Sequence, residues 1–105
     1  MAWIYLLIAG IFEIGWPLGL KLAHNSDIKL FWILFAVIAM ALSGFLLYLA
    51  QRDIPIGIAY IVWTSIGAVG TFIVGVAAFG DVLSLAKTFA VLLILSGVAI
   101  LKLSH

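Results

Sequence analysis

One acidic residue, Glu13, lies near the middle of the first long apolar run of the chain, Ala2–Leu20. An ionised carboxylate inside a bilayer costs about 3 kcal/mol or more unless something pairs with it. Such a carboxylate therefore predicts a site that binds a cation or a proton. The alternatives are a neutral, hydrogen-bonded carboxyl that serves only helix packing, and a span that is not a membrane helix at all.

Residues around Glu13 strengthen the hypothesis of a site. In a helix, Gly10, Glu13, Trp16 and Pro17 share one face by their spacing. Trp16 can donate its indole N–H to the carboxylate, or its ring can face a bound cation. Pro17 lacks the N–H that would bond the Glu13 carbonyl, so a kinked or loosened helix is predicted there. A passive kink that neighbouring groups satisfy is the alternative to a role in motion or substrate contact.

Polar side chains in two later apolar runs could complete this site. Ser43 could reach Glu13 across a helix interface, or could bond its own backbone one turn earlier. Tyr60, Trp63 and Thr64 project on one side of a helix and are predicted to line the same cavity. Tyr and Trp are also typical of the membrane interface, which is the alternative for them.

Glycines follow these aromatic residues in the third run. Gly67 and Gly70 are predicted to permit a bend in a helix that lines a cavity. A bend of this kind is one way to alternate access between two sides of a membrane. The two glycines are therefore candidate hinge residues.

The composition of the 105 residues is that of an integral membrane protein, with 68% hydrophobic and 9% charged residues and a mean hydropathy of +1.42. The formal net charge of +1, with its basic residues scattered, argues against binding of nucleic acid. There is no cysteine, and His24 and His105 lack the companions of a metal site. We expect no metal and no cofactor.

Four membrane-spanning helices are predicted, because a crossing needs about 20 apolar residues. The N-terminus lacks the basic segment of a signal peptide, so the first run is expected to be a retained helix. The fold class is all-α integral membrane, with residues 1–105 as a single domain. The expected spans are Ala2–Leu20, Leu30–Ala50, Pro55–Phe79 and Leu83–Leu103.

The distribution of basic residues indicates no preferred orientation in the membrane. Two of them fall on the side of the termini and three on the other: Arg52 and Lys102, against Lys21, Lys29 and Lys87. So small a bias predicts insertion both ways round, or an orientation fixed by a partner. The alternative is that the N-terminal amine and lipid effects decide the orientation.

An oligomer is expected, because four short helices enclose little volume. Small residues let membrane helices approach one another closely. Ala90 and Gly97 lie seven residues apart in the fourth run and are the predicted contact between copies.

Together these residues resemble the small multidrug resistance family of proton-coupled exporters over essentially the whole chain. The resemblance is carried by the four-helix length, Glu13, Lys21, the segment 55–63 and the segment 67–70. Within the family the chain is most similar to the guanidinium-exporter branch, on Gly10–Glu13, Trp16, Leu20-Lys21, Trp63-Thr64, Ile66–Ala68 and Leu101-Lys102. Pro17 and Ser65 depart from the family pattern close to the predicted cavity.

The resemblance implies an antiparallel homodimer of oppositely inserted copies in the bacterial inner membrane. It implies that Glu13 of each copy binds either protons or a cationic substrate. Trp16, Ser43, Tyr60 and Trp63 match family positions that enclose or hydrogen-bond this glutamate pair.

The sequence thus favours a multi-pass, proton-coupled antiporter that exports guanidinium or substituted guanidinyl compounds by alternating access. Its expected partners are a small cation, protons, lipid and a second copy. Two alternatives stay open: an exporter of quaternary ammonium compounds, and a non-transporting membrane subunit that needs a heteromeric partner. An intramembrane enzyme is disfavoured, because the sequence offers no paired nucleophile and base.

Overall fold

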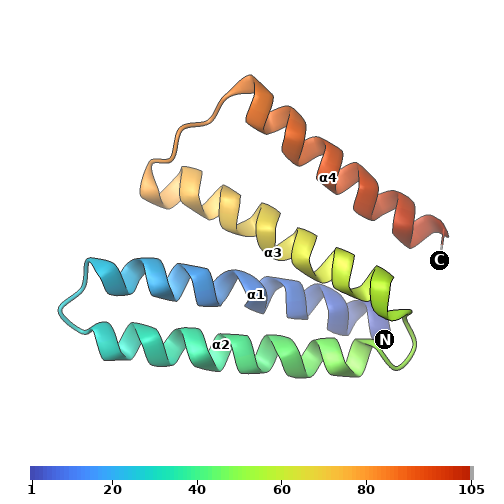
Figure 1. The fold of residues 1–105 in the computed structure, drawn as a ribbon, viewed down its shortest axis with the longest axis horizontal. Helices are drawn as coiled ribbons and strands as arrows, with labels where there is room; N and C mark the ends of the chain where they lie inside the picture. Colours follow the sequence, from blue (N-terminus) through green and yellow to red (C-terminus); the bar gives the residue numbers. More distant parts are fainter. Residues whose placement is uncertain (105) are drawn as a thin grey trace.

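The computed structural model, which describes residues 1–104, contains four helices (Figure 1). Each helix is long and apolar enough to cross a membrane, which confirms the all-α membrane architecture. His105, considered above as a metal ligand, lies outside the described residues. The helices are α1 (Ala2–His24), α2 (Lys29–Ala50), α3 (Ile56–Phe79) and α4 (Leu85–Ser104).

The helix ends differ from the predicted spans by up to one turn. Helix α1 continues past Leu20 to His24, because backbone hydrogen bonding persists where long side chains such as Lys21 can extend toward water. Helix α4 begins at Leu85 rather than Leu83. The Lys87 N–H donates to Ser84 Oγ at 3.2 Å, as a side chain does at a helix start.

Helices α1 and α2 lie side by side, α3 packs against α1, and α4 packs along the outer side of α3 (Figure 1). The start of α1 and the end of α4 lie at the same end of the molecule. At that end the Lys102 ammonium lies 5.5 Å from the centre of the Trp3 ring. This order places the turn after α1 and the turn after α3 together at the opposite end.

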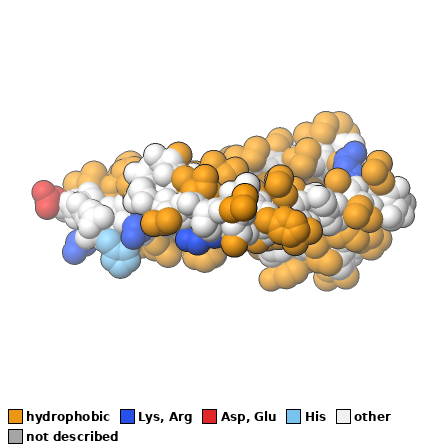
Figure 2. Space-filling model, turned by 90° about the horizontal axis from the view of Figure 1, so that it is seen from above, with side chains coloured by type: hydrophobic (Ala, Val, Ile, Leu, Met, Phe, Trp, Pro, Cys, Tyr) orange, Lys and Arg blue, Asp and Glu red, His pale blue; other side chains and the backbone are white. Residues whose placement is uncertain are grey.

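A small buried core joins α1 to the start of α3 and to the turn before it. Its members are Leu6, Ala50, Ile54, Ala59 and Val62. Most large apolar side chains point outward instead, and none of the residues of α4 is buried. Figure 2 shows hydrophobic side chains over most of the face in view, with charged side chains in small separate groups. Such a surface is suited to lipid or to another membrane helix.

Candidate functional site

Glu13 lies on α1 in direct contact with α3. Gly67 of α3 is buried against it, and a Cβ added to Gly67 would overlap Glu13 Cγ. Beside this contact is a hollow of about 290 Å³, which we call the Glu13 hollow. It is lined by Glu13, Trp16, Pro17, Thr64, Gly67, Ala68 and Thr71. The absence of a side chain at Gly67 is thus what lets the carboxylate side chain lie against α3.

Trp16 holds one oxygen of the carboxylate. Its indole Nε1–H donates to Glu13 Oε1, which is the hydrogen bond that the spacing on α1 allows. Among residues 1–104, no hydrogen bond to the other oxygen, Oε2, is present. The geometry fixes the orientation of the carboxylate and leaves one oxygen available to a ligand in the hollow.

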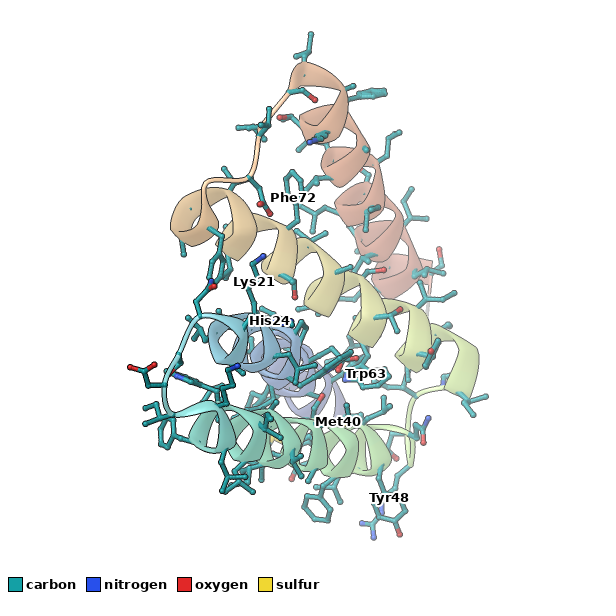
Figure 3. All side chains as sticks on the ribbon, turned by 60° about the vertical axis from the view of Figure 1, so that its left-hand side comes forward. Lys21, His24, Met40, Tyr48, Trp63 and Phe72 are labelled. Carbon is teal, nitrogen blue, oxygen red and sulfur yellow. The ribbon has the colours of Figure 1, made fainter. Side chains whose placement is uncertain are left out.

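Ser43 joins three helices next to the site. Its hydroxyl donates to the Ala9 carbonyl of α1 at 2.7 Å and accepts from Trp63 Nε1 of α3 at 2.8 Å. The sequence left two partners open, Glu13 and the serine's own helix, and the structure contains neither. The rotation of α2 turns Ser43, which is fully buried, toward the turn of α1 that precedes Glu13. Figure 3 shows Trp63 pointing from α3 into the space toward α1 and α2.

Four of the eight predicted binding and pocket residues line the Glu13 hollow, namely Glu13, Trp16, Pro17 and Thr64. Thr64 lines it while its hydroxyl donates to the Tyr60 carbonyl at 2.8 Å. Pro17 lies inside α1, which is one unbroken helix from Ala2 to His24.

The other predicted pocket residues lie outside this hollow. Gly10 is buried against Ile66, whose Cγ2 would lie 2.6 Å from an added Cβ. Tyr60 is 55% exposed, with its ring centre 5.5 Å from that of Trp63. Trp63 is held by Ser43. Their role in a pocket therefore stays a prediction.

The predicted hinge residues lie within a continuous α3. Gly67 accommodates Glu13, and Gly70 accommodates Ile14, whose Cδ1 would overlap a Cβ at that position. The predicted contact residues Ala90 and Gly97 are exposed on α4, and Gly97 has nothing within 4 Å of an added Cβ. Both assignments stay predictions.

Sequence reasoning missed Ala68 and Thr71 as lining residues. A signal was present, because Thr64, Gly67, Ala68 and Thr71 follow the three- and four-residue spacing of one helix face.

The groups that line the hollow are of the kind that can interact with a cation. Its lining offers one carboxylate, one indole and two threonine hydroxyls. Within residues 1–104 no group of three or more His, Cys, Asp or Glu side chains could hold a metal ion. A carboxylate with one fixed and one available oxygen suits a small hydrogen-bonding cation.

The chain is similar in sequence to known proteins over all four helices. The family described as Small Multidrug Resistance protein matches residues 1–94. A Yersinia pseudotuberculosis protein named guanidinium exporter is 47% identical over 104 residues, covering 99% of both chains. A guanidinium exporter of Citrobacter freundii is 43% identical over 104 residues, covering 99% of this chain and 98% of its own. One of Salmonella typhimurium is 42% identical over the same length.

Proposed function

Because this chain belongs to the Small Multidrug Resistance protein family, we propose that it exports guanidinium or small substituted guanidinyl cations in exchange for protons. The observation that carries the proposal is the Glu13 carboxylate in its hollow between two membrane-spanning helices, oriented by Trp16. The names of the relatives support the choice of cation.

The hollow suits a planar cation with several N–H donors. A guanidinium ion presents its N–H groups in a fork that matches a carboxylate. Glu13 Oε2 accepts one of them, and the hydroxyls of Thr64 and Thr71 on the opposite wall are further acceptors. The indole ring of Trp16 supplies an aromatic face beside the cation.

Exchange follows from the use of one carboxylate by two ligands. A proton and a guanidinium ion each neutralise Glu13, and neither binds well while the other is present. Without a ligand the carboxylate is charged. A change of access from one side of the membrane to the other is then unfavourable, because the charge must be desolvated. Each passage of a cation is therefore coupled to the passage of protons in the opposite direction.

The transporting unit of the proposal is an antiparallel homodimer in the bacterial inner membrane. The exposed apolar surface of α4 and the even distribution of basic residues support it. Ala90 and Gly97 form the contact between copies, and the two Glu13 carboxylates titrate as a coupled pair. Gly67 and Gly70 are the hinge at which α3 bends during alternating access.

The test is the electrical current in proteoliposomes of the purified chain after rapid addition of guanidinium. A current arises because the two Glu13 carboxylates of the proposed dimer allow the exchange of unequal numbers of protons and cations. We expect a current from the unaltered chain and from Asp27→Asn, which removes an exposed acidic charge in the turn after α1. We expect none from Glu13→Gln, which keeps the shape of the side chain but cannot be charged.

Other outcomes would change the proposal. A response to tetra-alkylammonium ions but not to guanidinium would favour the quaternary ammonium alternative. Silence toward both cations, from protein shown to be folded and dimeric, would favour the subunit that needs a partner. A full current in Glu13→Gln would overturn the carboxylate mechanism.

A further inference from the structure

A second hollow adjoins the first, toward the end of the molecule where α1 and α3 end. Its volume is about 250 Å³, and its lining includes Lys21, Phe79 and Asp81. Pro17 and Thr71 line both hollows, so the two meet along α1 and α3. We call this second hollow the mouth. Its lining carries the charged side chains of Lys21 and Asp81, whereas that of the Glu13 hollow carries only Glu13.

The turn that follows α3 places the Asp81 carboxylate in the mouth. Gly80 ends the helix in the left-handed conformation, with φ of 71°, which an ordinary side chain disfavours. The chain then folds back, and the Asp81 N–H donates to the Gly75 carbonyl at 3.1 Å. A Cβ at Gly75 would overlap Asp81 Oδ2. The missing side chain at Gly75 thus leaves the space that the carboxylate uses.

A basic side chain lies on the opposite wall of the mouth. The Lys21 ammonium lies 6.0 Å from the centre of the Phe79 ring, a cation–π arrangement. Figure 3 shows Lys21 reaching from α1 toward α3. The mouth therefore presents one acceptor for a cation and one fixed positive charge that repels it.

We infer that the mouth is an outer cation-binding site, at which a guanidinium-type cation binds Asp81 on its way to or from Glu13. This inference rests on the proposed export function. The site is open to water, so the cation is held weakly and leaves quickly, as a relay on a transport route requires. Lys21 lowers the occupancy of the site, and the balance between Lys21 and Asp81 sets the apparent affinity for the cation.

The test compares initial rates of guanidinium transport in proteoliposomes for charge-neutralising variants at each end of the molecule. We expect Asp81→Asn to raise KM about threefold to fivefold with kcat unchanged, which is the effect of one charge contact in water. Asp53→Asn removes the same charge from the turn between α2 and α3 and is the matched control. We expect it to leave KM unchanged.

Two further variants probe the geometry of the mouth. Lys21→Gln should lower KM, whereas Lys29→Gln, at an exposed position on α2, should not. Gly75→Ala keeps every charge but displaces the Asp81 carboxylate, so it should raise KM as Asp81→Asn does. The difference between Asp81→Asn and the unaltered chain should shrink between ionic strengths of about 0.01 M and about 1 M, because salt screens an exposed charge.

The outcomes separate the inference from the function on which it rests. If the unaltered chain transports guanidinium and Asp81→Asn has the same KM as Asp53→Asn, the outer site is overturned and export stands. The same holds if both variants raise KM equally, since net charge and not position would then be responsible. If the unaltered chain carries no guanidinium current, the proposed function fails and the inference with it.

Discussion

Replacing Gly67 with alanine adds one methyl group where α3 contacts the Glu13 side chain. The added Cβ overlaps Glu13 Cγ and lies 3.0 Å from Glu13 Cβ. Glu13 Cβ is fixed to the backbone of α1, so either the carboxylate side chain rotates or the two helices separate. Rotation also breaks the hydrogen bond from Trp16.

The expected size of the effect follows from the cost of overpacking. Adding a carbon atom to a well-packed contact costs about 1 to 3 kcal/mol. If that cost is borne by the substrate-binding geometry, kcat/KM for guanidinium falls roughly 5-fold to 150-fold, since about 1.4 kcal/mol corresponds to a factor of ten. We expect most of the loss to appear in KM, because Glu13 is the proposed binding site of the cation.

The assay is initial-rate guanidinium uptake into proteoliposomes, with Gly57→Ala as the matched control. Gly57 lies in the same helix and has nothing within 4 Å of an added Cβ. An unchanged kcat/KM in Gly67→Ala would refute the argument from contact with Glu13. A fall in kcat alone, equal in Gly67→Ala and Gly70→Ala, would show that the bend and not the contact is what these glycines provide.

Three further predictions concern stability, pH and assembly. Ser43→Ala leaves the Trp63 indole N–H unpaired and should destabilise the protein by about 1 to 3 kcal/mol. In thermal denaturation in detergent, Ser43→Ala should lower the midpoint less when Trp63→Phe is also present. An unaltered midpoint in Ser43→Ala would contradict this. Lowering the pH should raise KM for guanidinium without changing kcat, by up to about tenfold per pH unit, because protons compete for Glu13; a pH-independent KM would oppose competition. Gly97→Ile should give monomers by mass measurement in detergent, and a retained dimer would exclude Gly97 from the contact.

The number and kind of elements could be predicted from the sequence, because apolar runs as long as a bilayer is thick have few other structures open to them. Their ends could not be placed as well. Hydropathy falls at Lys21, but the helical backbone continues to His24 because a lysine can extend its ammonium from the last turn.

Contacts within one helix could also be predicted from the sequence. Glu13 and Trp16 meet because three residues separate them on α1, and the structure contains their hydrogen bond. The partners of Ser43 depend on the rotation of α2 about its axis, which hydropathy leaves undetermined. The position of the Asp81 carboxylate depends on the turn at Gly80 and on the space above Gly75. Such features cannot be predicted without the three-dimensional packing of the helices.

The central claim is that a cation and a proton use the same carboxylate, and proton release on binding tests it most directly. Guanidinium is added to the purified protein in weakly buffered detergent solution, and the change in pH is recorded with an indicator. We predict a saturable release of protons from the unaltered chain and from Asp27→Asn, and none from Glu13→Gln. Guanidinium binding without proton release, or a release that persists in Glu13→Gln, would contradict the account.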